Sequence, residues 1–272
     1  MSEPNAPTTD RLVQSTVPVD APAWMPDDPK VRILGIDIAD VTRGRAVQLV
    51  YEMIDAYAGR PRSVFFVNAH TLNLAAADAG YRQVLDAGTY VFGDGTGVRW
   101  AARMKGVRLR DNVNGTDLAP ELLAAMPGRR YFLLGADHDT VRRAAARAEI
   151  QFPNWTQVGF HHGYAGEDAL RDEVIPKINA AGPDLLLVGM GNPRQECWIH
   201  QYQSQLHVPV CMGVGGLFDF WAGNVSRAPS WLRWLGHEWL WRLCQQPADK
   251  ARRYLLGNPL FLLRAWADRI EA

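Results

Sequence analysis

The chain has 272 residues, which is long enough for one large domain, or for one domain with a smaller appendage. Its 29 Lys and Arg residues balance 29 Asp and Glu residues, so the composition does not favour nucleic acid as a partner. The three cysteines are odd in number and lack a C-x-x-C spacing, which argues against a disulfide framework or a zinc site and fits a reducing cytoplasm.

The amino-terminal segment does not look like a signal peptide, because no charged start precedes an apolar core. Residues 1–29 are rich in Pro, Asp, Ser, Thr and Ala and show little periodicity, which predicts a disordered leader. No apolar run approaches the roughly 20 residues that a membrane-spanning helix needs. We therefore expect a cytoplasmic protein that is soluble or bound peripherally to a membrane.

The first half of the chain predicts strands that alternate with helices. Val31–Ile38 is an apolar run with β-branched residues and is expected to form one strand. Thr42 is a candidate N-cap for a helix whose apolar residues recur on one face. Ser63–Val67 predicts a buried strand, an alanine-rich helix follows it to about Leu85, and Tyr90–Phe92 predicts a short strand.

The second half continues the same alternation. Tyr131–Leu134 predicts a strand, and Asp137 to about Gln151 predicts a helix. Leu185–Val188 and Val208–Met212 are continuous apolar strands that end at glycines. Strands that are apolar on both faces and separated by helices predict an α/β fold with a mainly parallel sheet and helices on each side.

A change of composition near residues 222–227 predicts a boundary between an α/β body of residues 30–223 and an appendage of residues 224–272. The appendage is crowded with tryptophan and arginine. Aromatic side chains settle at the depth of lipid headgroups, and cations gain from anionic lipid, so this composition favours a membrane-docking surface. A helical pair with its tryptophans packed against the body would have the same composition, and both descriptions can hold.

Polar residues follow the predicted strands at the point where each strand ends. In open parallel sheets, ligands bind at the carboxyl ends of the strands, near the topological switch point. The residues in this position are Thr71, Asn73, Asp94, Gln195, Glu196 and Asp219.

Two glycine-rich segments favour a phosphorylated ligand. Gly191, and Gly215 one strand later, let the backbone approach a ligand closely, although either segment could equally be a structural turn. Gln195 and Glu196 offer donors and acceptors to a sugar or base, or else cap a helix. The segment is not a dinucleotide fingerprint, because Arg194 stands where the third glycine is expected.

Two aspartates are candidates for chemistry. Asp219 lies between Phe218 and Phe220, so at strand spacing it faces away from both. It is either a ligand acceptor or a turn aspartate that bonds backbone amides. Asp94 lies between two glycines and either shapes a tight turn or acts as a general base whose pKa is raised by apolar neighbours.

The histidines do not predict a metal site. His161 and His162 are adjacent, and adjacent side chains seldom share one face, so a loop is the better interpretation of this segment. His70 and His237 are isolated, and no D-x-D motif demands a divalent ion. No metal ion is therefore predicted.

The motifs together resemble the WecG/TagA/CpsF family of bacterial glycosyltransferases, also called glycosyltransferase family 26, from about Leu34 to Arg253. They are Thr71-x-Asn73, Asp94-Gly95-x-Gly97, Gly115-Thr-Asp117-Leu118, Gly189-x-Gly191-x-Pro193-x-Gln195-Glu196, Gly215-Gly-x-Phe-Asp219, Arg227-Ala-Pro229 and Glu238-Trp-x-x-Arg242.

The resemblance implies an inverting enzyme that moves a sugar from a UDP-sugar to a polyprenyl-diphosphate-linked saccharide. Members of the family build teichoic acid linkage units, enterobacterial common antigen and exopolysaccharides. A Rossmann-like body, a membrane-docking appendage, activity without a metal or other cofactor, and a location on the inner face of the plasma membrane are implied as well. The donor sugar, the acceptor and the oligomeric state, including a homo-oligomer, stay open.

Site roles follow by position from the same resemblance. Asp94 takes the place of the general base that deprotonates the acceptor hydroxyl. The sugar pocket falls on Thr71 and Asn73, the nucleotide side on Tyr164, Gln195 and Asp219, and the lipid diphosphate on Arg242, Arg252 and Arg253.

One position departs from the family pattern. Where the family usually carries an arginine, two residues before the valine-x-glycine of the Gly115 motif, this chain has Asn112, with Arg110 nearby. An uncharged amide does not replace a guanidinium that steadies a diphosphate. Either Arg110 substitutes, or another group neutralises the leaving UDP. The competing hypothesis is a catalytically impaired nucleotide-binding regulatory or scaffold protein at the membrane.

Overall fold

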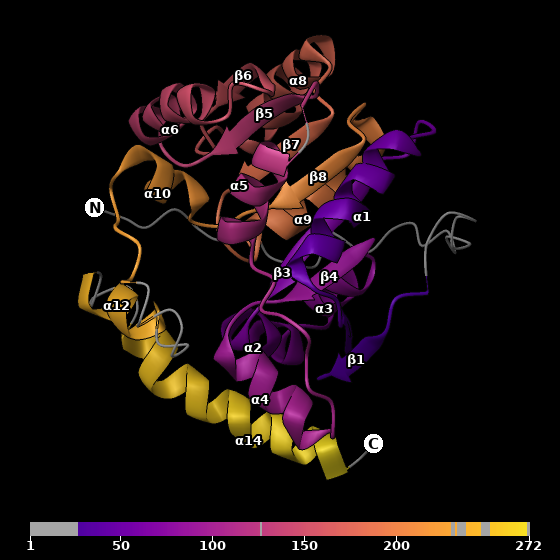
Figure 1. The fold of residues 1–272 in the computed structure, drawn as a ribbon, viewed down its shortest axis with the longest axis vertical. Helices are drawn as coiled ribbons and strands as arrows, with labels where there is room; N and C mark the ends of the chain where they lie inside the picture. The colour runs from indigo at the N-terminus through magenta and orange to yellow at the C-terminus, as the bar shows by residue number, and fades with distance from the viewer. Residues whose placement is uncertain (1–26, 126, 230–231, 233–237, 246–250, 271–272) are drawn as a thin grey trace.

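In the computed structural model, the described residues are 27–270 with the exception of 126, 230–231, 233–237 and 246–250. Within this part of the chain, eight strands form a single sheet in the order β1-β2-β4-β3-β8-β7-β5-β6 (Figure 1). The pairs from β2 to β6 are parallel, and β1 pairs with β2 antiparallel. The predicted α/β fold with a mainly parallel sheet is confirmed.

Beyond the first two strands the sheet has six more, of which five correspond to predicted strands and one was not predicted. They are β3 (Arg62–Val67), β4 (Tyr90–Gly93), β5 (Arg130–Gly135), β6 (Thr156–His161), β7 (Leu185–Gly189) and β8 (Val210–Gly213). Strand β6 has no counterpart among the predicted strands. Its side chains are half-buried or exposed because it lies at the edge of the sheet, so it lacks a continuous apolar run.

The amino-terminal edge of the sheet is a hairpin, whereas Val31–Ile38 was expected to form one strand. The chain turns between β1 (Lys30–Ile33) and β2 (Ile36–Ala39) at Leu34 and Gly35, whose φ angles are 49° and 82°. A two-residue hairpin turn of this kind needs positive φ at both central residues, and leucine is an unusual choice there. The prediction of one continuous strand is therefore wrong.

Helices cover both faces of the sheet. One face carries α1 (Arg43–Asp55), α5 (Gly115–Ala125), α6 (His138–Gln151) and α10 (Leu217–Ala222). The other carries α2 (Ala69–Ala77), α3 (Ala79–Asp86), α4 (Thr96–Met104), α7 (Glu167–Ala169), the π-helical turn η2 (Leu170–Val174), α8 (Ile175–Ala181), α9 (Arg194–Tyr202) and the short helix η3 (Gln203–Gln205). Successive strand residues such as Phe65 and Phe66 enter opposite cores, which is why the strands read as unbroken apolar runs.

Capping side chains set the bounds of two of the predicted helices. Helix α1 begins after Thr42, whose hydroxyl accepts a hydrogen bond from Arg45 N–H over 3.2 Å, as expected of an N-cap. The alanine-rich helix expected to continue to Leu85 is divided at Asp78, which leaves helical geometry. The Asp78 carboxylate then accepts from Tyr81 N–H over 3.1 Å and starts α3. A short polar side chain that caps a new helix explains the break.

The carboxyl-terminal segment crosses one end of the molecule (Figure 1). It contains α12 (Glu238–Gln245), the π-helical turn η4 (Arg252–Leu256) and α14 (Gly257–Ile270). Helix α14 packs against α2 and α4, and its Phe261 side chain is completely buried. None of the helices in the described ranges is both long and apolar enough to cross a bilayer.

Candidate active site at the carboxyl ends of the strands

Four neighbouring strands, β4, β3, β8 and β7, end at the same edge of the sheet because they are parallel. The turns that follow them contain Asn68 to Thr71, Asp94, Gly191 to Glu196, and Gly215. The fold therefore gathers the polar residues that the sequence placed after strands, at the edge where open α/β sheets bind ligands.

Asp94 follows β4 and lies beside the end of β3. Its backbone N–H donates to the Val67 carbonyl over 2.8 Å. The next residue, Gly95, has a φ of 93° and is the N-cap of α4. Gly95 N–H donates to the Asn112 side-chain oxygen over 2.5 Å. Asn112 was predicted only as a departure from a family pattern, and its contact with this turn is new information from the structure.

Thr71 is buried at the start of α2 and takes part in its cap. The Thr71 hydroxyl accepts from Asn68 N–H over 2.7 Å and donates to the Asn68 carbonyl over 3.0 Å. The Asn68 side chain in turn accepts from His70 N–H and Thr71 N–H, which completes a capping box. In this structure Thr71 thus shapes the turn after β3 from within the helix.

Asn73 lies one turn after this cap, in contact with the carboxyl-terminal segment. Its amide nitrogen donates to the Gly257 carbonyl over 2.7 Å. Arg264 of α14 donates to the Asn73 side-chain oxygen over 3.0 Å and to its backbone carbonyl over 2.9 Å. The residue predicted to line a sugar pocket is thus the contact point between α2 and α14, a connection that no local sequence pattern indicates.

Glycines allow the loops after β5, β7 and β8 to approach one another closely. Gly191 and Gly215 have φ angles of 78° and 56°, in the left-handed region that glycine adopts without strain. A Cβ atom on Gly135 would lie 2.3 Å from the Gly189 carbonyl oxygen. A Cβ atom on Gly189 would in turn meet the Phe218 ring at 2.8 Å. A Cβ atom on Gly191 or Gly215 would meet nothing within 4 Å, so the close packing lies at Gly135 and Gly189, and the approach of a ligand to Gly191 and Gly215 stays a prediction.

Gln195 and Glu196 are both buried at the start of α9. The Gln195 side-chain oxygen accepts from Gly215 N–H over 3.0 Å, and its nitrogen donates to Glu196 over 2.7 Å. The same Glu196 oxygen accepts from Asn192, and its other oxygen accepts from Tyr81 over 3.1 Å. The two residues predicted as ligand contacts therefore connect the glycine loops after β7 and β8 to each other and to α3.

The Glu196 carboxyl has an unusual environment for an acid. Burial raises its pKa to about 7, against the opposing effect of the hydrogen bonds from Gln195, Asn192 and Tyr81. Three donors around one carboxylate favour the ionised form, whereas loss of water disfavours it. The balance leaves a buried group that titrates near neutral pH.

Tyr164 and Asp219 border the same edge. The Tyr164 side chain is 73% exposed in the loop after β6, next to Gly163, which lies against Met190 of the β7 loop. Asp219 was expected at strand spacing, but it lies in helix α10, so this expectation is wrong. Its carboxylate accepts from the Asn224 side chain over 3.2 Å. The segment after β8 became helical because Gly216 ends the strand connection and the apolar residues suit a helical face against α6.

An ion pair that the sequence did not single out joins the appendage to the body. The Arg227 guanidinium pairs with the Asp117 carboxylate of α5 and lies 5.1 Å from the centre of the Phe220 ring. Burial raises the pKa of Asp117, but Arg227, Asn114 and Arg43 outweigh this effect, so the pKa lies below its ordinary value. Arg227 belongs to the Arg227-Ala-Pro229 motif, but the sequence of that motif does not predict that Asp117 is its partner.

The predicted lipid-diphosphate arginines differ in what the structure describes. The Arg253 guanidinium donates to the Asn68 side-chain oxygen over 3.2 Å, so it lies at the end of β3 close to Asp94. The side chains of Arg242 and Arg252 lie outside the described residues. Arg110 lies elsewhere, with its Nε 3.9 Å from the Asp40 carboxylate.

Three histidines, at the start of α6 and at the end of β6, form a ring cluster. The rings of His161 and His162 stack with centroids 4.5 Å apart, and the ring of His138 lies 6.1 Å from that of His162. Burial and the two neighbouring rings lower the pKa of His162. Within the described ranges, no three His, Cys, Asp or Glu residues gather in an arrangement that could hold a metal ion. Metal-independent activity stays a prediction.

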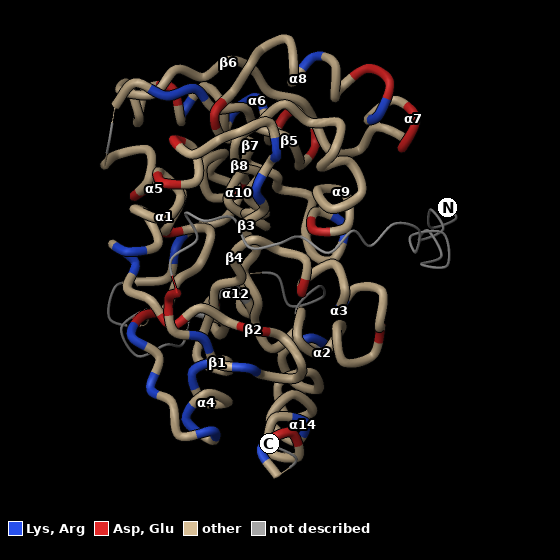
Figure 2. Tube along the Cα trace, turned by 90° about the vertical axis from the view of Figure 1, so that its right-hand side faces the viewer, with Lys and Arg blue, Asp and Glu red and all other residues tan. Residues whose placement is uncertain are grey.

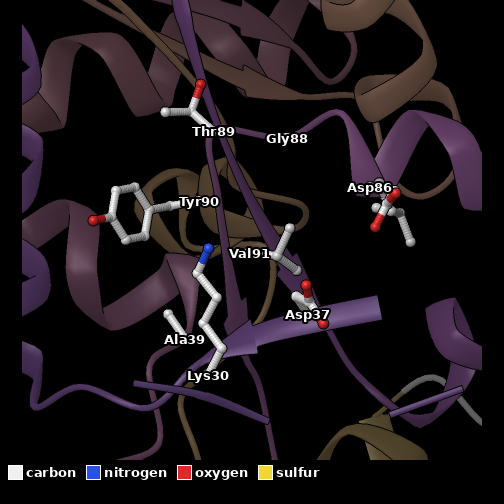
Figure 3. A pocket seen from close by; sticks show the side chains of 9 residues that line it. Lys30, Asp37, Ala39, Asp86, Gly88, Thr89, Tyr90 and Val91 are labelled. Carbon is white, nitrogen blue, oxygen red and sulfur yellow. The ribbon is translucent and has the colours of Figure 1, made fainter. Parts of the chain in front are cut away.

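A small cavity lies at the other end of the parallel strands, away from their carboxyl ends. It has a volume of about 80 Å³ and is lined by residues such as Lys30, Asp37 and Thr89, at the start of β4 (Figure 3). In Figure 3 the Lys30 side chain extends past Ala39 toward Tyr90. Small-molecule sites usually have volumes of several hundred Å³, so this cavity does not suit a nucleotide-sugar.

The sequence model described as "Glycosyl transferase WecG/TagA/CpsF family" matches residues 31–272. The chain is 36% identical over 183 residues to the N-acetylglucosaminyldiphosphoundecaprenol N-acetyl-beta-D-mannosaminyltransferase of Bacillus subtilis strain 168, with 66% of this chain and 70% of that protein covered. It is 34% identical over 219 residues to the protein of the same name from Staphylococcus aureus strain NCTC 8325 / PS 47, with 78% of this chain and 84% of that protein covered.

Proposed function

The chain belongs to the WecG/TagA/CpsF family of glycosyltransferases, and we propose that it transfers a sugar from a UDP-sugar to a polyprenyl-diphosphate-linked saccharide. The observation that carries the proposal is the position of Asp94, which lies at the same sheet edge as the glycine loops after β7 and β8. A base and N–H donors close to one another are what a transfer from a diphosphate leaving group requires.

The proposed reaction is a single displacement. An Asp94 carboxylate oxygen accepts the proton of the acceptor hydroxyl, and the hydroxyl oxygen bonds to the anomeric carbon of the donor. The bond from that carbon to the diphosphate oxygen breaks, and its electron pair leaves with UDP. Because attack and departure occur on opposite faces, the anomeric configuration inverts.

The names of the relatives favour a particular donor and acceptor. Both relatives are named for transfer of N-acetyl-β-D-mannosamine to N-acetylglucosaminyldiphosphoundecaprenol. We take UDP-N-acetylmannosamine and a polyprenyl-diphosphate-linked N-acetylglucosamine as the first pair to test. This favours a teichoic acid type of pathway over the exopolysaccharide type that the sequence left equally open.

The leaving diphosphate needs positive charge or N–H donors. Arg253 is the described arginine that reaches the end of β3, where its guanidinium contacts Asn68. Arg110 does not lie in this position, because it pairs with Asp40. We propose that Arg253 and the amides of the glycine loops share the negative charge that develops on UDP.

An enzyme that uses a lipid-linked acceptor must reach a membrane, and we propose that this protein binds peripherally to the inner face of the plasma membrane. Helix α14 supports this, because it carries apolar side chains on the face that does not pack against the body. Those with large exposed fractions are Leu263 at 68%, Trp266 at 55% and Ile270 at 67%. Leu256, the last residue of η4, is 67% exposed just before the helix begins.

Substitution of the proposed base tests the function. Asp94→Asn removes the proton acceptor with little change in shape, so turnover should fall roughly 100- to 10,000-fold while UDP binding stays nearly intact. UDP release with short-chain lipid-linked acceptors measures turnover, and calorimetry measures UDP binding. Asp86→Asn is the matched control and should leave both unchanged, because Asp86 is an exposed carboxylate at the end of α3, beside the cavity at the start of β4.

Two outcomes would contradict the proposal in different ways. Near-normal turnover of Asp94→Asn would remove Asp94 from the role of base while leaving a transferase. Binding of UDP without turnover of any donor by the unsubstituted chain would favour the regulatory or scaffold alternative.

A further inference from the structure

The peptide groups on either side of Asp94 form hydrogen bonds with adjacent segments of the protein. The Asp94 N–H donates to the Val67 carbonyl over 2.8 Å, and Val113 N–H donates to the Gly93 carbonyl over 3.1 Å. The first bond continues the ladder between β3 and β4, and the second ties the strand end to the loop before α5. Backbone hydrogen bonds thus fix the chain as it enters Asp94.

The Asn112 side chain holds the backbone on the carboxyl-terminal side of Asp94. Gly95 N–H donates to the Asn112 side-chain oxygen over 2.5 Å. Gly95 has a φ of 93° and is the N-cap of α4, where it has no side chain of its own to cap the helix. A glycine with this freedom adopts many conformations unless a partner holds it. Asn112 is that partner, and it lies one residue from the Val113 bond.

We infer that Asn112 is a positioning residue of the transferase, which acts through the Gly95 amide to hold the Asp94 carboxylate toward the acceptor hydroxyl. The inference rests on the proposed role of Asp94 as the base. An asparagine suits the task because its side-chain oxygen is an acceptor. A guanidinium at the same position has only N–H donors and cannot accept the Gly95 hydrogen bond.

The surroundings of Arg110 support a structural role for this loop that does not depend on charge. Arg110 N–H donates to an Asp40 oxygen over 2.7 Å, and its side chain is 55% exposed. The loop is therefore anchored at Arg110 to the segment after β2 and at Asn112 to the turn after β4. The Asn112 side-chain oxygen is thus used for the contact with the Gly95 amide.

Amide hydrogen exchange tests the contact without any substrate. In the full-length protein the Gly95 amide should exchange faster in Asn112→Ala than in the unsubstituted chain, because its acceptor is removed. Asn112→Asp keeps an acceptor oxygen and should keep the protection. Arg110→Ala is the control in the same loop and should leave Gly95 unchanged. Equal exchange of Gly95 in the unsubstituted chain and in Asn112→Ala would overturn the inference.

Steady-state kinetics tests the consequence for turnover. Asn112→Ala should lower kcat by roughly 10- to 100-fold, because small misplacement of a catalytic group is costly, while KM for the UDP-sugar stays within about twofold. Asn112→Asp keeps an acceptor oxygen for the Gly95 amide and should keep a higher kcat than Asn112→Ala. Asn112→Arg should stay impaired. A raised KM with unchanged kcat in Asn112→Ala, or full activity of Asn112→Arg, would overturn the inference.

The two measurements separate this inference from the proposed function. If the unsubstituted chain turns over no UDP-sugar, the proposed function fails, and the exchange result still decides whether Asn112 holds the turn. If the unsubstituted chain is active and Asn112→Ala matches its kcat, the positioning role alone fails. Arg110→Ala should match the unsubstituted kcat in either case.

Discussion

At the scale of single residues, Glu196 is the group whose environment has the clearest measurable effect. Its carboxylate accepts hydrogen bonds from Gln195, Asn192 and Tyr81 while it is completely buried. Through Gln195 it fixes the Gly215 amide, so the loops after β7 and β8 are parts of one hydrogen-bonded unit. The geometry of the proposed UDP side depends on this unit.

Replacement of Glu196 by Gln should change how stability depends on pH. The pKa of Glu196 is raised from 4.5 to about 7 in the folded protein. The folded chain therefore holds the proton better than the unfolded chain, and the unsubstituted protein loses stability as pH rises from about 4.5 to 7. With 1.36 kcal/mol for each tenfold change in proton affinity, the loss amounts to roughly 3 kcal/mol at most. Glu196→Gln should lack this loss, so its advantage in unfolding free energy grows over the same pH range in denaturant titrations.

The matched control is Glu149→Gln on α6, a carboxylate outside this hydrogen-bonded unit. It should follow the pH dependence of the unsubstituted chain. A constant difference in unfolding free energy between Glu196→Gln and the unsubstituted protein across pH 4.5 to 7 would show that Glu196 does not titrate in this range.

The sequence located most of these residues but not the directions of their side chains. The strand-end rule placed Gln195, Glu196 and Asp94 at one edge, which the fold confirms. It could not show that Gln195 points inward to Gly215, because that partner is 20 residues away and depends on how β7 and β8 pair. Asn112 was visible only as an exception to a pattern, since its contact with Gly95 forms between a loop and a strand end.

At the scale of elements, helix α14 is held to the body by contacts along its length. Phe261 and Ala265 are buried, and a Cβ atom on Gly97 of α4 would lie 3.5 Å from the Phe261 ring. Asp268 accepts a hydrogen bond from Leu34 N–H over 2.9 Å. Lys105 pairs with the same carboxylate over 3.0 Å. The helix is thus docked onto α2, α4 and the amino-terminal hairpin.

Loss of the Arg264 contact should loosen this docking. Arg264→Ala removes the charge-assisted hydrogen bonds that one guanidinium nitrogen shares between the two oxygens of Asn73, which together contribute about 1.5–3 kcal/mol. Amides of α14 should therefore exchange roughly tenfold to a hundredfold faster. Arg269→Ala changes an exposed arginine of the same helix and should not alter exchange. Equal exchange in the two variants would mean that Arg264 does not hold α14 in place.

The elements that sequence patterns predicted well are those whose cores are continuous. Helix α1 and strands β3, β5 and β7 follow their patterns because each buries apolar residues at the expected spacing. The hairpin at Leu34 and Gly35 and the break at Asp78 were missed. Both depend on the backbone angles of one or two residues, which tertiary packing selects. The spacing of apolar residues in the sequence does not predict such angles.

At the scale of the whole molecule, charge and apolar surface are distributed unevenly although the net charge is zero. Figure 2 shows Lys and Arg concentrated around β1 and α4, at the same end of the molecule as α14. The exposed Trp100 of α4 belongs to this end as well. Basic residues beside an apolar helix face complement an anionic lipid surface.

Charges placed on the outward face of α14 should weaken membrane binding. The double substitution Leu263→Glu and Trp266→Glu replaces side chains that are 68% and 55% exposed. Burial of such side chains contributes about 1.5–3 kcal/mol each, so partition onto anionic vesicles should fall at least roughly tenfold. Ile150→Glu, at an 82% exposed position on α6, is the matched control and should bind vesicles normally. Unchanged flotation of the double variant with vesicles would refute docking through α14.

The packing of α14 beneath α2 and α4 has a consequence for which acceptors the enzyme accepts. If α14 lies on the bilayer as proposed, a single layer of helices, about 8–10 Å between axes, separates the lipid surface from the turn that carries Asp94. On the proposed function, this fixed distance would suit an acceptor whose reactive hydroxyl stands one sugar above its diphosphate, whereas a longer saccharide would carry its terminal hydroxyl past Asp94. The number of sugars on the acceptor would then be limited by the distance from the bilayer to Asp94, and not by recognition of each sugar.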